Sequence, residues 1–152
     1  MLHTIVSLSI QDIQYLAHSF ARRMMEWGEP IPDFETRYPN ILESCINTPF
    51  QKFNKKFLYK GLEEKAAILF YLLIKNHPFQ NGNKRIAVMS LLVFLHVNKK
   101  WLITEPNGLY RFAVWVAQSP TEVRDEVVMA IRKFIKKNIV NIADVKGSLI
   151  VT

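Results

Sequence analysis

The sequence has a single cysteine, no long apolar run and no leader-like pattern at its amino terminus. Each of these shortages excludes a class of protein. Cys45 is the one cysteine in 152 residues, so the chain cannot form an intrachain disulfide and is not a disulfide-stabilised secreted scaffold. The longest runs that are almost wholly apolar, 66–74 and 86–95, have nine and ten residues, whereas a membrane-spanning helix needs about 20. No basic stretch precedes an apolar one at the amino terminus, so we expect no secretory signal. These shortages predict a cytoplasmic protein without a membrane partner, in which Cys45 is a small buried apolar residue.

The composition is that of one globular domain, because 49% of the residues are hydrophobic and 22% are charged. At this length, folding removes roughly 68–70% of the extended chain's surface from water, so the core needs neither a disulfide nor a metal. We therefore expect a single domain over residues 1–152, with its core at about 5–137 and a tail at 138–152.

Acidic residues are scarce in the second part of the chain. Residues 1–48 hold three Lys and Arg against six Asp and Glu, whereas residues 49–152 hold seventeen against seven. The later segment thus carries a net charge of +10 and is expected to attract anions, whether phosphates, nucleic acid or an acidic partner.

The hydrophobic periodicity predicts an all-α fold of about six helices. Ser9 and Asp12 form a capping pair ahead of the first apolar stripe, which we expect to end at Gly28. Two segments, 62–76 and 84–97, are apolar on nearly every side and are expected in the middle of the bundle. The remaining helices are expected at 41–46, 107–117 and 121–137. Residues 138–152 have no clear period, and a strand, a docking tail and disorder all remain open.

Residues 49–61, PFQKFNKKFLYKG, combine four lysines with aromatic residues and have no helical stripe. This pattern predicts an extended or hairpin segment. The same interleaving suits stacking on single-stranded nucleic acid, so a basic nucleic-acid-binding module is the non-enzymatic alternative. We do not expect nucleic acid as a partner, because the lysines are spread over several elements and no zinc-finger or RNA-binding sheet signature is present.

The connection between the two central helices contains the chemically unusual residues. Pro78 disfavours helical dihedrals at His77, so the first helix should end there and present the imidazole. Gly82 permits a left-handed backbone, and the next helix should begin at Asn83 or Lys84 with its first amide N–H groups pointing outward. Such a helix start binds phosphate readily.

Lys84 and Arg85 place two cations in the first turn of that helix, where they oppose the helix dipole unless an anion is bound. These nine residues combine three features that suit phosphate-ester chemistry on a hydroxyl substrate: a general base at His77, a helix start that binds anions, and two cations. On these residues alone an ordinary solvated turn remains an alternative.

The stretch HPFQNGNKR closely resembles the signature of the Fic/Doc family, His-x-Phe-x-Asp/Glu-Gly-Asn-x-Arg. The resemblance extends upstream through ILESCINTPFQ and downstream through VFLHVNKKW, and covers roughly residues 5–135. It implies a compact all-α Fic/Doc-type bundle with a short extended or hairpin flap before the central helix pair.

The resemblance also implies a role for each matched residue. His77 would be the general base that deprotonates a target hydroxyl, and Phe79 would anchor the loop in the core. The expected phosphate-binding residues are Gly82, Asn83, Lys84 and Arg85. The stretch from Gln51 to Phe57 resembles a flap that pairs with an extended segment of the target, and its expected docking residues are Gln51, Lys52, Phe53 and Asn54. An ordinary basic surface hairpin is the alternative for this stretch.

Two positions favour phosphoryl transfer over adenylyl transfer. Family members that transfer an adenylyl group have a glycine and a second arginine where this chain has Lys84 and Val88. A lysine at the first position matches the death-on-curing, or Doc, branch, which moves the γ-phosphoryl group of a nucleoside triphosphate such as ATP to a target hydroxyl. The resemblance therefore implies a toxin of a toxin–antitoxin system that modifies a Ser, Thr or Tyr side chain. Translation factors are one class of target, and adenylyl transfer stays as the alternative.

Asn81 departs from the family, which usually has Asp or Glu there as a ligand for Mg²⁺. A neutral amide is a weaker ligand, so we expect lowered metal affinity, and a catalytically weakened protein remains an alternative. No glutamate has Ser or Thr four residues before it, so the self-inhibitory helix motif of the family is absent. Control by a separate antitoxin is expected instead. The sequence identifies neither the target nor the oligomeric state.

Overall fold

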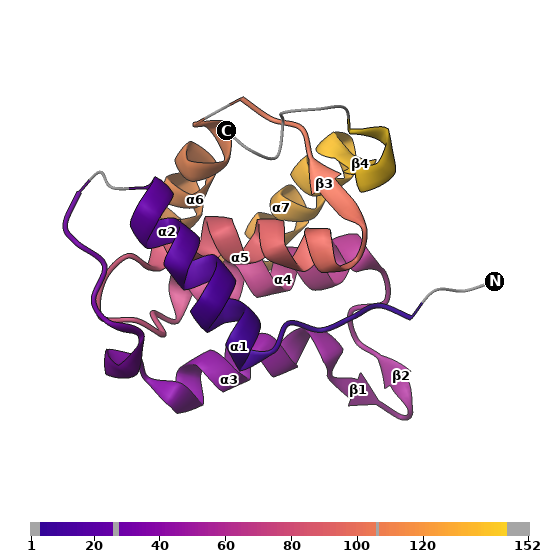
Figure 1. Ribbon diagram of the computed structural model, residues 1–152. Helices are drawn as coiled ribbons and strands as arrows, with labels where there is room; N and C mark the ends of the chain where they lie inside the picture. The colour runs from indigo at the N-terminus through magenta and orange to yellow at the C-terminus, as the bar shows by residue number, and fades with distance from the viewer. Residues whose placement is uncertain (1–3, 26–27, 106, 146–152) are drawn as a thin grey trace.

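The structure is a computed structural model that describes residues 4–25, 28–105 and 107–145 (Figure 1). It is a helical bundle whose buried apolar side chains form one cluster, with two short two-stranded sheets, and this confirms the predicted all-α fold class. The first helix consists of α1 (Ile10–Asp12), a π-helical segment (Ile13–His18) and α2 (Ser19–Met24). The others are α3 (Pro39–Asn47), α4 (Leu62–Lys75), α5 (Asn83–Val97), α6 (Gly108–Gln118) and α7 (Arg124–Asn138). The strands are β1 (Lys52–Phe53), β2 (Lys56–Phe57), β3 (Lys100–Leu102) and β4 (Ile139–Asn141).

The first helix begins at the predicted capping pair. Ser9 Oγ accepts a hydrogen bond from the Asp12 amide at 3.0 Å, and Asp12 Oδ2 accepts one from the Ser9 amide at 2.9 Å. Two of the amide donors at the helix start are therefore satisfied by local side chains.

The end of the first helix differs from the prediction. We expected the helix to reach Gly28, and this is wrong, because it ends at Met24 and Met25 leaves the helical region with φ −125° and ψ 66°. The Met25 carbonyl accepts a hydrogen bond from Arg85, which lies 60 positions later in the chain. Trp27, the last residue of the predicted stripe, lies outside the described residues.

α4 and α5 form the centre of the bundle, as their apolar composition predicted. Figure 1 shows them in the middle of the bundle, where α2 packs against α5, α6 packs against both central helices and α7 packs against α4. Residues 65–74 are buried without interruption, and each large apolar side chain among them contributes roughly 1.5–3 kcal/mol through burial. Both ends of the α4–α5 connection are consequently held by the most buried part of the protein.

Cys45 lies in the same core and has no exposed surface. Burial raises the pKa of the Cys45 thiol to about 12, although a hydrogen bond with Asn76 acts in the opposite direction. The thiol is therefore a core group and not a nucleophile at neutral pH.

The sheet formed by β3 and β4 was not predicted. No strand was expected between the helices predicted at 84–97 and 107–117, but Trp101 pairs with Val140 in an antiparallel ladder. Part of the unassigned carboxyl-terminal stretch is therefore a strand, and residues 146–152 lie outside the described residues. Among the described residues no helix has the length and apolar character needed to cross a membrane.

The predicted hairpin is present and projects at the start of α4 (Figure 1). Lys52 pairs with Phe57 and Phe53 with Lys56. The two turn residues, Asn54 and Lys55, have φ values of 50° and 65°, as a two-residue hairpin turn with the twist of its strands requires.

Candidate active site

His77 lies at the exposed end of α4. The helix ends at Lys75, and His77 itself has a left-handed φ of 51°, which is uncommon outside glycine. The carbonyl of the following Pro78 accepts a hydrogen bond from the Tyr38 amide at 2.8 Å, so the loop is tied to the residue that precedes α3. His77 is exposed to solvent.

The side chain of Asn83, the first residue of α5, forms hydrogen bonds with the backbone of the loop. Its Oδ1 accepts a hydrogen bond from the Phe79 amide at 2.9 Å, and its Nδ2 donates to the Phe79 carbonyl at 2.8 Å. The same Nδ2 lies 3.5 Å from His77 Nδ1. One buried amide side chain thus places the imidazole beside the amino-terminal end of α5.

Phe79 fixes the loop to the protein interior. Its ring is 4% exposed and lies 5.8 Å from the His18 ring and 6.0 Å from the Phe34 ring, measured between centroids. His18 Nε2 lies 2.9 Å from the carbonyl oxygen of Pro32, and burial lowers the pKa of His18. A neutral His18 on the first helix therefore contacts both the segment before α3, at Pro32, and the loop, at Phe79.

Gly82 brings the loop against residues 28–38, called the 28–38 segment below. Its φ is 80°, a left-handed value, and a Cβ added to it would lie 2.7 Å from Ile31 Cγ1. A side chain at this position would meet both backbone strain and a steric clash. Glycine is therefore required for the turn and for the close approach of the two segments.

The two cations at the start of α5 have different surroundings. Lys84 is half-buried, whereas the Arg85 side chain is 6% exposed. Arg85 Nη1 donates to the Met25 carbonyl at 3.1 Å and Nη2 donates to the Glu29 carbonyl at 2.6 Å. A cleft of about 240 Å³ adjoins it, lined by Arg22, Met25, Gly28, Pro30, Ile31 and Arg85. Lys84 is thus the more accessible cation, and Arg85 faces a cleft that a second arginine also lines.

Asn81 has a carboxylate beside it. Its Nδ2 donates to Glu29 Oε2 at 3.3 Å and to the Pro30 carbonyl at 3.4 Å. Among the described residues no group of three or more His, Cys, Asp or Glu side chains could hold a metal ion. Mg²⁺ commonly uses one or two carboxylates and completes its shell with water and substrate phosphates. Asn81 and Glu29 fit such a site, with phosphates as the remaining ligands.

The structure does not bring the predicted docking residues Gln51, Lys52, Phe53 and Asn54 near His77. They lie at the start of α4 and His77 follows its end, and α4 has 14 residues, or about 21 Å of helix. The loop packs instead against the 28–38 segment and, through Phe79, against His18 of the first helix. No local pattern in the sequence of the 28–38 segment indicated what it would contact.

Comparisons with known proteins agree with this geometry. The model of the Fic/DOC family matches residues 7–95, more than half of the chain. A protein named Toxin Doc from Mycolicibacterium smegmatis is 32% identical over 66 residues, which is 43% of this chain and 51% of that protein. The chain thus spans about half the length of this curated relative, and no solved structure gives a significant match. Because the family match includes the whole His77 loop, its anchor Phe79 and the helices on both sides, the chain belongs to the Fic/Doc family.

Proposed function

We propose that this chain is a Doc-like toxin that transfers a phosphoryl group from a nucleoside triphosphate to a hydroxyl side chain of a target protein. The observation that carries the proposal is the exposed His77 imidazole, 3.5 Å from Asn83 at the amino-terminal end of α5. A proton acceptor and a helix start that favours phosphate lie next to each other there.

His77 acts as the general base in this proposal. The imidazole takes the proton of a Ser, Thr or Tyr hydroxyl, and the oxygen attacks the γ-phosphorus. The bond between that phosphorus and the bridging oxygen breaks, and the nucleoside diphosphate leaves with the electron pair. The imidazolium then gives its proton to water. Positioning and charge stabilisation supply most of the rate enhancement in such a reaction.

The phosphates lie at the start of α5 in the same proposal. The turn formed by Gly82 and Asn83 presents backbone amides, and Lys84 adds an accessible ammonium group. Arg85 has five N–H donors, and those not used by the Met25 and Glu29 carbonyls remain for phosphate. Asn81 and Glu29 would hold Mg²⁺, which supplies neutralisation of the phosphate charge when bound.

Adenylyl transfer is the second candidate, since members of this family perform either reaction. Val88 is buried, 5% exposed, and offers no cation where adenylyl-transferring members have an arginine. The arginine that can bind the polyphosphate through two hydrogen bonds in adenylyl-transferring members is therefore absent, and Lys84 stands where those members have a glycine. Both features favour phosphoryl transfer.

Labelled ATP distinguishes the two reactions. The chain is incubated with a bacterial lysate and ATP labelled at either the α- or the γ-phosphate, beside the variants His77→Ala and His96→Ala. His96 is an exposed histidine of α5 and serves as the matched control. We expect transfer of the γ label only, lost in His77→Ala and kept in His96→Ala. Transfer of the α label would establish adenylyl transfer, and transfer of neither label would establish a catalytically weakened protein.

A separate antitoxin is part of the proposal, because the self-inhibitory motif is absent from the sequence. Expression of the chain alone should arrest bacterial growth, and the His77→Ala variant should not. Growth that is unaffected by a folded wild-type chain would contradict the toxin assignment.

A further inference from the structure

The outer face of α7 carries charged groups of both signs around one large apolar side chain. The inner face of the helix is buried and consists of Val127, Ile131 and Ile135. Residues three and four positions apart lie on the same face of a helix, so Glu126, Met129 and Lys133 form one stripe on the opposite side. All three are exposed to solvent, and Met129 is 45% exposed. We call these three residues the α7 stripe.

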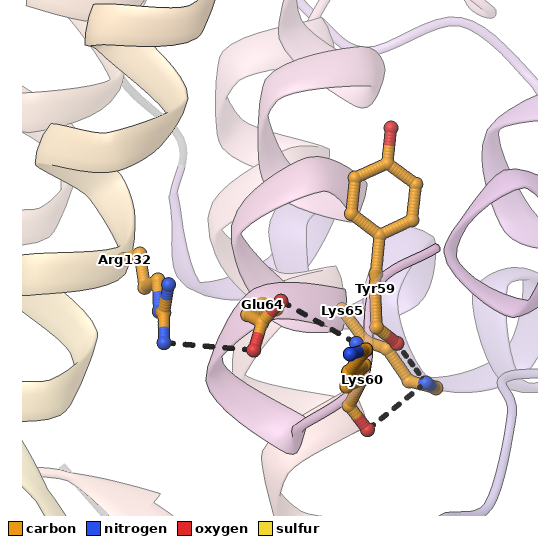
Figure 2. Close-up of polar contacts among 5 residues, drawn as sticks. All are labelled: Tyr59, Lys60, Glu64, Lys65 and Arg132. Carbon is orange, nitrogen blue, oxygen red and sulfur yellow. Dashed lines mark hydrogen bonds and ion pairs between the residues drawn. The ribbon is translucent and has the colours of Figure 1, made fainter. Parts of the chain in front are cut away.

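One edge of α7 is tied to α4 by an ion pair, shown in Figure 2. Arg132 Nη2 lies 3.5 Å from Glu64 Oε1, and Glu64 Oε2 accepts a hydrogen bond from the Lys60 amide at 3.4 Å. Arg132 thus has its acid within the chain. Among the described residues, by contrast, neither Glu126 nor Lys133 forms an ion pair. The α7 stripe therefore offers uncompensated charge from a helix that is fixed on its other side.

The helix dipole explains only part of this charge pattern. It favours acids in the first turn of a helix and lysines in the last turn, and α7 has both. It does not explain Lys133, which precedes the last turn, or the exposed Met129 in the middle of the helix. A groove of about 450 Å³ lies on the same face, lined by Asp125, Glu126, Met129, Ala130 and Lys133. An apolar centre with a charged rim is the composition of a protein–protein contact.

The outer face of α7 is complementary to a reversed copy of itself. Glu126 and Lys133 are equally far along the chain from the midpoint between residues 129 and 130. Glu122, in the short 3-10 turn before α7, and Lys137 share that midpoint, and both are exposed. Two copies of α7 placed antiparallel across a two-fold axis at this point therefore bring each glutamate opposite a lysine of the other copy. A wholly acidic or wholly basic partner would instead meet like charge over half of this face.

We propose that the outer face of α7 is a self-association surface, on which a second copy of this chain docks antiparallel about a two-fold axis between residues 129 and 130. Met129 of each copy packs against the small side chain of Ala130 of the other, and a Glu126–Lys133 ion pair lies on either side. α7 has 15 residues, or about 22 Å of helix, so the contact is smaller than the roughly 800 Å² per partner of a standard interface. The dimer is consequently weak and dissociates on dilution. The proposal does not depend on phosphoryl transfer, because α7 supplies no residue of the candidate active site.

Charge reversal tests the proposal by sedimentation velocity over a range of protein concentrations. The wild type should self-associate as its concentration rises, and less so as salt is added. Glu126→Lys and Lys133→Glu each place like charges opposite each other on both sides of the axis, so each should raise the dissociation constant of the dimer by about tenfold. Glu43→Lys makes the same change of charge at an exposed glutamate of α3 and should self-associate as the wild type does. Circular dichroism checks that each variant is folded.

An equimolar mixture of the two single variants distinguishes this arrangement from other modes of association. In a dimer of one Glu126→Lys chain and one Lys133→Glu chain, every reversed residue faces a residue of opposite sign. The mixture should therefore associate about as the wild type does, and so should the double variant Glu126→Lys/Lys133→Glu. A wild type that stays monomeric at millimolar concentration would overturn the proposal. A mixture that associates no better than the single variants, or an equal loss in Glu43→Lys, would also overturn it.

Cysteine cross-linking measures the register independently. Met129 lies beside the proposed axis, so the Met129→Cys variant should place two identical thiols close together in the dimer and form an intermolecular disulfide under a mild oxidant. Cys45 has no exposed surface and a raised thiol pKa, so the introduced cysteine is the reactive one. Glu43→Cys is the matched control and should cross-link much more slowly. Equal rates in the two variants would contradict the antiparallel contact at residue 129.

Discussion

Two connections at opposite ends of α4 are held in opposite ways (Figure 1). The His77 loop has an exposed imidazole but is supported by buried groups, the Phe79 ring and the Asn83 amide. The hairpin is exposed from Gln51 to Leu58 and is supported at its root by the buried ammonium of Lys65. The two connections thus differ in their support: an apolar ring and an amide side chain hold the His77 loop, whereas a buried cation holds the hairpin.

The largest expected effect is the loss of transfer on removal of the His77 imidazole. A general base typically contributes about 10²–10⁴-fold to a rate. His77→Asn is the sharper variant, because asparagine tolerates the left-handed φ of 51° better than alanine does. We expect transfer to fall by that factor while the melting temperature stays near that of the wild type. Retained transfer in a folded His77→Asn variant would remove His77 from the mechanism.

Matched phenylalanine variants test the difference in support directly. Phe79 is 4% exposed and Phe53 is 67% exposed. Phe79→Ala should lower the free energy of unfolding by about 3–5 kcal/mol, and Phe53→Ala should change it by less than about 0.5 kcal/mol. Urea denaturation measures both values. Similar losses in the two variants would show that the hairpin is as deeply integrated in the fold as the loop.

Asn81→Asp should make the stability of the loop depend on Mg²⁺. The new carboxylate would lie beside Glu29, whose Oε2 is 3.3 Å from Asn81 Nδ2, and two adjacent carboxylates repel each other unless a cation binds. We expect a lower melting temperature than wild type in EDTA, recovery on adding Mg²⁺, and faster transfer at limiting Mg²⁺. The Glu29→Gln/Asn81→Asp variant should lose most of the Mg²⁺ dependence of the melting temperature. A melting temperature of Asn81→Asp that Mg²⁺ leaves unchanged would argue against a metal site here.

The smallest expected effect is the pH dependence caused by His18. Burial lowers its pKa in the folded state, so below the ordinary value of 6.5 the unfolded chain binds more protons and stability falls as the pH falls. The fall is at most about 1.4 kcal/mol per pH unit and ceases below the lowered pKa. His18→Gln should reduce this acid sensitivity, and the exposed His96→Gln should not. Urea denaturation between neutral and mildly acidic pH measures the difference.

Local chemistry determined the elements that the sequence predicted well. The Ser9–Asp12 cap, the central helices and the two-residue hairpin turn each depend on hydrogen bonds or dihedral preferences within a few residues. Gly82 belongs to the same group, since its left-handed φ of 80° suits a residue without a Cβ. The position of the His77 loop between two apolar helices therefore follows from the sequence alone.

The tertiary structure alone decided what each of these elements contacts. The first helix ends at Met24, and the carbonyl of the next residue, Met25, accepts a hydrogen bond from Arg85, 60 positions later in the chain. Strand β3 pairs with β4, which begins at Ile139. Packing of the 28–38 segment against Gly82, and the separation of the hairpin from His77, are likewise long-range results. The sequence by itself determined the His77 loop and its family signature, because these are local. The neighbours of the loop depend on which distant surfaces become buried together, and no local pattern of residues specifies that.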